Sequence, residues 1–572
     1  MNIRKIVMMK KLLIFMLLAS GCSTVSAQIT QKDKDDFFGK EDKDDFFGKG
    51  TKEDFYSKDD PGFAAERQKM YENFNKFRQE ALKNYADYVR KAWKDYKANP
   101  AVEAPKDEMV KPQFAPGAEE QTASWFSKLF GLDKRKARKA QKQAKPDAQP
   151  DAKPAERPSV SVQVDEVIKP EPAIPQPQPQ IAVEPRQEKA NDYMTFSVFG
   201  TECKVRIGNN CRFRLRDVSS GAVADAIANV FPGQQFENML SDCLEERKRH
   251  GFSDWAYYQM LLALTNKFYG NTSEGVLCQA FLYSQSGYKM RLAHDANKLY
   301  MLAATRHFIF NKQFYVLDGD WYFLLGGDKV EQLGICEASF PNESSLSLQI
   351  SAAQLLADNP TMKRTITSRF NGDFSFTITS NKNYIDFFET YPSSTVNNNF
   401  MTRWSMYANT PLEKGIREQL YPPMKAKLQG LSQREAVQQL LWWMHGEVDL
   451  EGQIKQADCF LYNYDETVWG VDRAFFGEET LFYPYCDCED RSILLSHLVR
   501  DVLGLDVVLV HYPGHLAMAV NFTEPMEGNY DYVTLDGRRF VICDPTFIGG
   551  HVGDTMTGCE NQPITVILLK RG

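Results

Sequence analysis

Three residues near the C-terminus have side chains that could carry out nucleophilic chemistry together: Cys488, His515 and Asp544. A deprotonated cysteine is a strong nucleophile, an imidazole can take the thiol proton, and a carboxylate can fix the ring tautomer of the imidazole. Cys488 precedes His515 by 27 residues, and His515 precedes Asp544 by 29. These separations let each residue arrive on its own element, so we expect a Cys-His-Asp catalytic triad.

The nucleophile is predicted at the start of a helix. Apolar residues recur with helical spacing over 493–503, and the pattern stops at Gly504, a usual helix terminator. The first helical turn has unpaired N–H groups and the positive end of the helix dipole, which favour a thiolate over a thiol. The sequence therefore predicts an activated thiol at Cys488.

The base and the acid are predicted on strands. Residues 507–510 form one expected strand, and a turn at 512–514 is followed by His515 at the head of a strand at 516–520. A last strand at 540–543 leads directly into Asp544. We expect both strands to place these side chains beside the start of the helix.

Several neighbours of Cys488 have expected supporting roles. Glu489 and Asp490 are first-turn acids that stabilise the helix rather than catalysts. The oxyanion hole should use the backbone N–H of Cys488 and a donor from the preceding segment. Three aromatic residues are equally candidates for packing and for walls of a substrate cleft: Trp469, Tyr483 and Tyr485.

The C-terminal motifs resemble the transglutaminase-like superfamily of cysteine enzymes. Asp-Cys-Glu-Asp at 487–490, Gly-His-Leu-Ala at 514–517 and Cys-Asp-Pro-Thr at 543–546 occur in the order of that family, over roughly the last 160 residues. The resemblance implies a core helix on an antiparallel sheet and thiol acyl chemistry on amides, without choosing among transferases, peptidases and amidases. Cys486 departs from the pattern, because a small residue such as Gly is commoner there.

Each of these residues also has an ordinary structural interpretation. A lone cysteine is more often a buried apolar filler, a lone histidine a satisfied polar residue, and an aspartate before proline a turn residue. A zinc site is a further alternative, built from Cys486, Cys488, His515 and Cys543. Their spacing lacks the usual paired ligands of structural zinc sites, so we expect neither a metal nor a cofactor.

The middle of the chain is aligned with the C-terminal domain at an offset of 217 to 218 residues, which places Gly287 on Gly504 and residues 317–319 on 535–537. On this alignment Asn271, Lys298 and Gly326 stand opposite Cys488, His515 and Asp544. The region is then a degenerate, catalytically inactive copy. Coincidence is the alternative, because helix-strand-strand order is common.

The expected fold class is α+β, with two α+β modules after a long disordered N-terminal region. The basic residues before an apolar stretch at 12–19 indicate a secretory signal, cleaved after 27 or, in a lipoprotein, after 21 with a lipid anchor on Cys22. The expected order is a signal peptide at 1–27 or 1–21, disordered acidic-aromatic repeats at 28–62, an amphipathic helix at 63–97, a Pro-rich linker at 98–190, an α+β module at 191–335, a β-rich segment at 336–400 and the catalytic domain at 401–572.

Within the first module a hairpin is expected over 195–215, with its turn at the Gly-Asn-Asn of 208–210 between Cys203 and Cys211. Pairing across this turn would not bring the two thiols face to face, so we expect few or no structural disulfides. Helices are expected at 222–231, 236–250, 255–268, 274–284 and 411–448, and strands at 289–293, 299–303, 321–325, 347–350 and 374–378.

The composition limits the partners. A formal charge of −7 is of the wrong sign for a nucleic-acid-binding protein. We therefore expect an exported cysteine amidase or peptidase of the periplasm or cell envelope that acts on protein or cell-wall peptide, with hydrolysis favoured over transfer. The alternative is a non-catalytic envelope adaptor in which these folds bind peptides and the Phe-Phe repeats at 33–40 and 42–49 contact an envelope protein.

Overall fold

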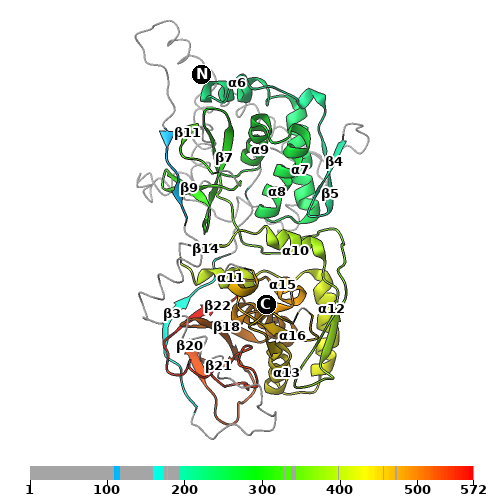
Figure 1. Cartoon of the computed structure of the whole chain (residues 1–572), viewed down its shortest axis with the longest axis vertical. Coiled ribbons are helices and arrows are strands. Elements are labelled where there is room, and N and C mark those ends of the chain that lie inside the picture. The colour runs from blue at the N-terminus through cyan, green and yellow to red at the C-terminus, as the bar shows by residue number, and fades with distance from the viewer. Residues whose placement is uncertain are drawn as a thin grey trace, which may run out of the picture. The chain divides into compact units, whose positions relative to one another are not determined.

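The computed structural model describes residues 109–115, 159–172, 177, 193–326, 329–336, 343–396, 399–454, 456–469 and 473–570. The expected signal peptide, the repeats at 28–62 and the helix at 63–97 lie outside these ranges. The described chain is mixed α+β, with helices packed on antiparallel sheets (Figure 1). None of its helices combines the length and the apolar composition needed to cross a lipid bilayer.

The N-terminal module contains a seven-stranded antiparallel sheet in the order β1-β11-β6-β7-β10-β9-β2. Every residue of the central strand β7 is buried, so both faces of the sheet are covered at its centre. The strands are β1 (Met109–Val110), β2 (Gln113–Phe114), β6 (Met290–His294), β7 (Leu299–Thr305), β9 (Gln313–Leu317), β10 (Asp320–Leu324) and β11 (Leu333–Cys336).

Helices cover one face of this sheet. Figure 1 shows α9 beside β7, and α9 also packs on α8. Ser253 and Thr272 cap α8 and α9 by accepting a hydrogen bond from the third residue beyond each cap, which satisfies an otherwise unpaired N–H. The helices are α6 (Ser220–Asn229), α7 (Gln234–His250), α8 (Asp254–Tyr269) and α9 (Ser273–Gln285), and a hairpin of β4 (Tyr193–Val198) and β5 (Thr201–Arg206) packs on α7.

The C-terminal module contains a six-stranded sheet in the order β20-β21-β19-β18-β22-β3. Neighbouring strands are antiparallel except for β3, which lies parallel to β22 at the edge. The strands are β3 (Val164–Ile168), β18 (Asp506–Tyr512), β19 (His515–Asn521), β20 (Tyr532–Leu535), β21 (Arg538–Cys543) and β22 (Ile564–Leu568).

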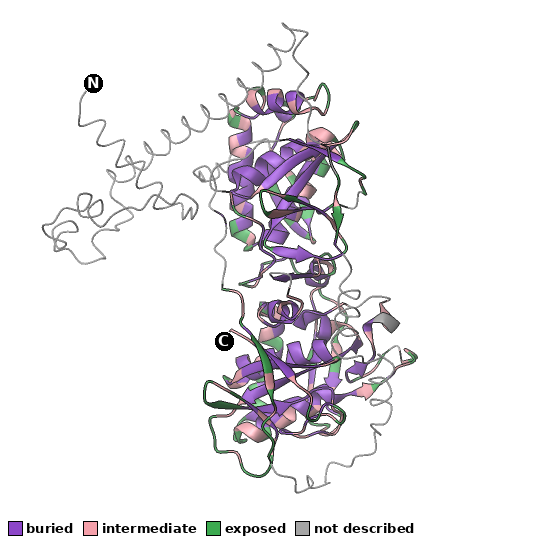
Figure 2. Ribbon diagram, turned by 90° about the vertical axis from the view of Figure 1, so that its left-hand side faces the viewer, coloured by how far each residue is buried: buried purple, intermediate pink, exposed green. Residues whose placement is uncertain are grey.

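The central helix of this module is α16 (Cys488–Leu503). It begins with a capping box between Asp487 and Asp490 and ends at Gly504, whose φ of 69° is the left-handed conformation that glycine adopts most easily. It packs on β18 and β19 and on four helices. Figure 2 shows that buried residues predominate in the helices and strands of the described chain. The four helices are α11 (Thr402–Ala408), α12 (Lys414–Leu428), α13 (Gln433–His445) and α15 (Gly477–Phe482).

The two modules repeat one arrangement. Each has a helix, α9 or α16, followed by strands whose order in the sheet is β11-β6-β7-β10-β9 in the first module and β22-β18-β19-β21-β20 in the second. The hairpin turns match as well, because Asp318-Gly319 and Asp536-Gly537 both have positive φ at two successive residues, as a type I′ turn requires. The alignment proposed from the sequence therefore coincides with a repeat of strand order and turn geometry.

Four expectations about local structure were wrong. The segment expected to be a linker at 98–190 supplies β1, β2 and β3, because the open edges of both sheets can pair with short segments that have little periodicity of their own. The first hairpin turns at Phe199-Gly200, with φ of 45° and 66°, and Gly208 precedes a short 3₁₀ turn instead.

The other two expectations that were wrong concern the segment 336–400. It contains the helix α10 (Lys382–Glu389) besides β12 (Arg364–Thr367), β13 (Ser375–Ile378) and β14 (Ser394–Val396), so it is less β-rich than expected. Residues 347–350 alternate in polarity but form no strand. The ten cysteines in the described part of the chain all carry reduced thiols.

Candidate active site

Cys488 is the first residue of α16, as the sequence predicts. Its sulfur lies against the backbone N–H of Leu516, the residue after His515. One turn along the helix, the Ser492 hydroxyl donates to the carbonyl oxygen of the same leucine at 2.9 Å. These two contacts fix the start of α16 on the start of β19.

His515 and Asp544 are brought together by the pairing of β19 with β21. Met518 lies opposite Cys543, so the residue after β21 falls beside the first residues of β19. His515 Nε2 lies 2.7 Å from Asp544 Oδ2, and the Thr546 backbone N–H donates to Asp544 Oδ1 at 2.9 Å. The hydrogen bond at Nε2 leaves Nδ1 as the ring nitrogen that can accept a proton.

The thiol of Cys488 makes its hydrogen bond to Glu489, not to His515. Cys488 Sγ donates to Glu489 Oε2 at 3.0 Å, and the other carboxylate oxygen of Glu489 lies 3.6 Å from Arg403 Nη2. Glu489 therefore connects the thiol to a buried guanidinium. The structure therefore brings His515, the expected base, into direct contact with Asp544, the expected acid. It places Cys488, the expected nucleophile, against Leu516, the residue that follows His515.

The protonation state of Cys488 differs from the sequence-based expectation. Burial raises the pKa of the Cys488 thiol well above its usual range, and the negative charges of Glu489 and Asp487 raise it further. The Leu516 N–H lowers the pKa, but by less. Desolvation and two adjacent acids therefore outweigh the helix N-terminus, and the group is a thiol in this conformation.

The acids of the first turn have different roles. Asp490 stabilises the helix start, as expected, because it accepts hydrogen bonds from the backbone N–H groups of Asp487 at 3.2 Å and Phe475 at 2.8 Å. Burial raises the pKa of both aspartates, with the charge of Glu489 as a second cause. Glu489 also contacts the thiol directly, a contact that its expected helix-stabilising role does not include.

Two residues that sequence reasoning missed hold the backbone around Asp544. His445 Nε2 donates to the carbonyl oxygen of Asp544 at 3.3 Å, and burial lowers the pKa of His445 to about 4. Arg491 Nη1 donates to the carbonyl oxygens of His445 at 3.2 Å and Pro545 at 3.5 Å. The signal for Arg491 was available in the sequence: a cation one turn after Cys488, in a helix that is otherwise apolar on this side.

The three aromatic candidates separate in the structure. Tyr485 is a packing residue, because it is buried and its hydroxyl donates to Asp449 Oδ2 at 2.9 Å. Trp469 and Tyr483 are half-buried and contact each other edge to face, with ring centroids 4.7 Å apart. A further donor is Asn463, whose buried Nδ2 has no hydrogen-bond partner among the described residues and whose backbone N–H donates to the Cys486 carbonyl at 3.4 Å.

The zinc alternative finds no support in the geometry. Three groups of side chains in the described part of the chain could hold a metal ion, and none of them combines Cys486, Cys488, His515 and Cys543. Cys486 instead accepts from Arg491 Nε at 3.4 Å, and Cys543 donates to the carbonyl of Val541 at 3.5 Å. Two of the three groups lie at the start of α16 and share Asp487: one is Asp487, Cys488 and Glu489, and the other is Asp465, Asp487 and Asp490.

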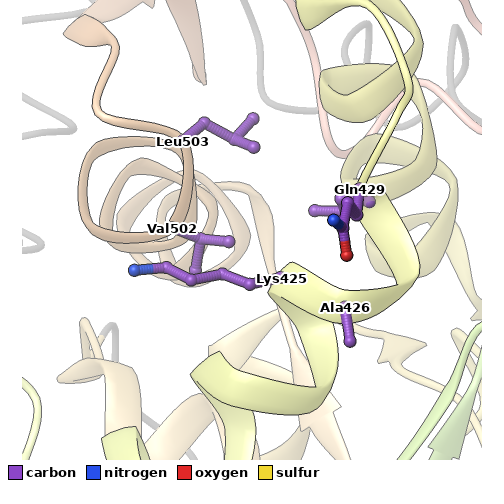
Figure 3. A pocket seen from close by; sticks show the side chains of 6 residues that line it. Lys425, Ala426, Gln429, Val502 and Leu503 are labelled. Carbon is purple, nitrogen blue, oxygen red and sulfur yellow. The ribbon is translucent and has the colours of Figure 1, made fainter.

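The three side chains are buried. Cys488, His515 and Asp544 are 9%, 7% and 2% exposed. A pocket of about 400 Å³ lies elsewhere, between the C-terminal ends of α12 and α16, and Figure 3 shows Lys425, Gln429 and Val502 lining it. Val502 is 14 residues after Cys488, roughly 21 Å along an α-helix, so this pocket is not the reaction site.

The corresponding position of the N-terminal module has no triad. Ser273 is the first residue of α9, and its hydroxyl accepts from the backbone N–H of Leu299 at 3.1 Å, as the Cys488 sulfur lies against that of Leu516. The structural equivalent of the nucleophile is therefore Ser273 rather than Asn271. Lys298 and Gly326 occupy the positions aligned with the base and the acid.

Comparison of the chain with protein-family models, with curated proteins and with solved structures gives no match.

Proposed function

We propose that the C-terminal module is a transglutaminase-like cysteine amidase or peptidase in which Cys488 is the nucleophile, His515 the base and Asp544 the residue that orients the base. The observation that carries the proposal is the 2.7 Å hydrogen bond between His515 Nε2 and Asp544 Oδ2. The next residue of the strand, Leu516, has its backbone N–H against the Cys488 sulfur. The order of the motifs and the helix-on-antiparallel-sheet arrangement support the same assignment.

The chemistry begins with rotation of the thiol from Glu489 toward His515 Nδ1. The sulfur attacks the carbonyl carbon of an amide while His515 takes the thiol proton, which gives a tetrahedral intermediate. Collapse of this intermediate breaks the C–N bond, and His515 gives its proton to the departing amine. A water then attacks the thioester, passes a proton through His515 to the sulfur, and releases the acid.

The negative oxygen of the tetrahedral intermediate needs two donors. The backbone N–H of Cys488 is one, because the first N–H groups of a helix have no partner within the helix. The Asn463 side chain is the second, since its buried Nδ2 lacks a partner and its backbone is hydrogen-bonded to the residue two positions before Cys488. A buried donor without a partner costs free energy that an oxyanion would recover.

The basic and apolar N-terminus supports export to the periplasm or cell envelope, with or without a lipid anchor at Cys22. Envelope proteins and cell-wall peptides are therefore the proposed substrate class. Hydrolysis is favoured over transfer to an amine because water is the abundant acceptor there.

A second candidate is a non-catalytic adaptor that binds peptides. The burial of the three side chains, the raised pKa of the Cys488 thiol and its hydrogen bond to Glu489 favour it. The absence of a triad at Ser273, Lys298 and Gly326 in the other module favours it as well. In this case the N-terminal repeats would tether the partner.

Labelling with a thiol-directed acylating probe distinguishes the two functions. Selective labelling of Cys488 that rises with pH and is lost in His515→Ala supports the enzyme. Labelling of Cys488 no faster than of Cys486, the buried thiol two residues away, contradicts it. Incubation of the full chain with peptidoglycan fragments and envelope proteins, read by mass spectrometry against Cys488→Ala, then identifies the amide that is cleaved.

A further inference from the structure

The N-terminal module contains a buried cluster of three chemically different side chains outside the proposed active site. Cys203 comes from β5, and Glu246 and His250 come from α7. One ligand atom from each lies within 4.8 Å of the others; Cys203 and Glu246 are buried, and the His250 side chain is 12% exposed. A thiol, a carboxylate and an imidazole have no reason to gather in an apolar core unless they bind one another or a shared ion.

The spacing of these residues places them on facing surfaces. Glu246 and His250 are four residues apart, so they project from the same face of α7. Along β5 the buried residues alternate with more exposed ones, and Cys203 is the middle residue of the buried row, which faces α7. The three side chains of the cluster therefore meet between α7 and β5.

The histidine is held in the orientation that a metal ligand needs. His250 Nδ1 donates to the carbonyl oxygen of Leu355 at 3.3 Å, and its ring stacks on Phe252 at a centroid distance of 5.1 Å. His250 Nε2 donates to Glu246 Oε2 at 3.1 Å, so this ring nitrogen and this carboxylate oxygen face the same point. A carbonyl that orients a ligating imidazole in this way is the usual outer partner of a metal-bound histidine.

Little movement is needed to seat an ion. Zinc bonds to sulfur, nitrogen and oxygen ligands are about 2.0 to 2.3 Å long, so ligand atoms in a tetrahedral site lie about 3.3 to 3.8 Å apart. Nε2 and Oε2 are 3.1 Å apart, close to this separation, and the Cys203 sulfur lies within 4.8 Å of one ligand atom of each of the other two residues. Sulfur, nitrogen and oxygen donors together suit zinc better than calcium or magnesium, which take oxygen ligands.

We propose that Cys203, Glu246 and His250 bind a zinc ion that joins the β4–β5 hairpin to α7. Binding breaks the S–H bond of Cys203 and the Nε2–H bond of His250, releases both protons to solvent, and leaves the thiolate, the neutral imidazole and the carboxylate as ligands. A water completes the tetrahedron from the side on which His250 is 12% exposed. The proposed zinc site does not involve Cys488, so a test of the zinc site neither supports nor contradicts the proposed catalytic function.

The test uses the full chain with Cys488→Ser, so that the proposed active-site thiol cannot bind the metal. After removal of metals, zinc is added, the chain is dialysed, and bound zinc is counted. One zinc per chain is expected, with X-ray absorption showing one sulfur ligand, and replacement by cobalt should give a thiolate-to-cobalt absorption band. Cys203→Ser and His250→Gln should each weaken zinc binding at least about 10-fold to 100-fold.

Cys211→Ser is the matched control, because Cys211 is a buried cysteine of the same module that is not in the cluster. It should keep the zinc and the cobalt band. Zinc that is absent after dialysis, that lacks a sulfur ligand, or that is retained undiminished in Cys203→Ser overturns the proposal. The sulfur count on the Cys488→Ser chain decides the matter even if the Cys203→Ser variant fails to fold.

Discussion

His515 Nε2 and Asp544 Oδ2 lie 2.7 Å apart, although 29 residues separate them in the chain. The pairing of β19 with β21 makes this contact, and His445 and Arg491 hold the backbone at Asp544 and Pro545. A buried carboxylate on the far side of an imidazole stabilises the imidazolium that forms when the ring takes a proton. We therefore propose that the contact serves catalysis, and mutation can test this.

Replacement of this carboxylate should slow acylation of Cys488. Asp544→Asn preserves the shape but permits the wrong ring tautomer, so the rate of hydrolysis of an activated aryl ester should fall by about 10²-fold to 10⁴-fold. Asp554→Asn is the control, since it removes a carboxylate 3.5 Å from His551 in a second His-Asp pair. Equal rates of ester hydrolysis in Asp544→Asn and Asp554→Asn would show that Asp544 has no catalytic role.

Glu489 should suppress the reactivity of the thiol. Its negative charge raises the pKa of Cys488, so Glu489→Gln lowers that pKa and increases the thiolate fraction at neutral pH. The pH midpoint of Cys488 alkylation should move to lower pH, and the rate at pH 7 should rise. Glu418→Gln, at an exposed pair with Lys414, should leave the midpoint unchanged. A midpoint that moves upward in Glu489→Gln would contradict the electrostatic assignment.

Asn463 should stabilise the transition state rather than the bound substrate. Asn463→Ala removes one oxyanion donor and should lower kcat by about 10²-fold with little change in KM. Asn521→Ala, which removes an exposed amide that donates to the Arg539 carbonyl, is the matched control. A change confined to KM would show that Asn463 contacts substrate in its ground state instead.

The stability of the C-terminal module should fall between acidic and mildly alkaline pH. Burial raises the pKa of Glu478 to about 8, so the folded state binds a proton that the unfolded chain loses near its ordinary value of 4.5. This contribution is fully present below about pH 4.5 and is lost as the pH rises to about 8, a change on the order of a few kcal/mol.

Denaturant unfolding of Glu478→Gln across this pH range should show a smaller loss of stability than the unaltered chain. Burial also raises the pKa of Glu479 and of Glu413 to about 7, so part of the slope remains. His445 has a lowered pKa and acts in the opposite direction, because its contribution is lost as the pH falls from 6.5 to about 4. If the free energy of unfolding changes equally with pH in Glu478→Gln and in the unaltered chain, Glu478 does not contribute to the pH dependence.

A thiol at the equivalent position of the N-terminal module should remain inert. Ser273→Cys places sulfur at the start of α9, but Lys298 and Gly326 provide no imidazole and no carboxylate. Its alkylation should be no faster than that of Cys211 in the same chain, measured by mass spectrometry of labelled peptides. Rapid labelling of the new thiol would indicate a base in this module that the alignment does not identify.

Local sequence determined the elements that carry the proposed site. The apolar period, the Asp487 cap and Gly504 define α16 to within a residue, because caps and periodicity act over neighbouring positions. The same is true of β19 and β21, whose runs of β-branched and apolar residues place His515 and Asp544 at strand ends. The shared Asp-Gly turns also made an alignment of the two modules visible in the sequence, whereas the order of strands within the two sheets was not.

Tertiary structure decided the protonation and the partners of these side chains. The pKa of Cys488 depends on its burial and on charges that surround it in space, and these outweigh the helix dipole that the sequence made visible. The strands in the segment 109–168, the role of Arg491 and the equivalence of Ser273 with Cys488 likewise depend on contacts between distant residues. Sequence pattern reports the period of an element, whereas desolvation and edge pairing depend on what the rest of the chain places beside it.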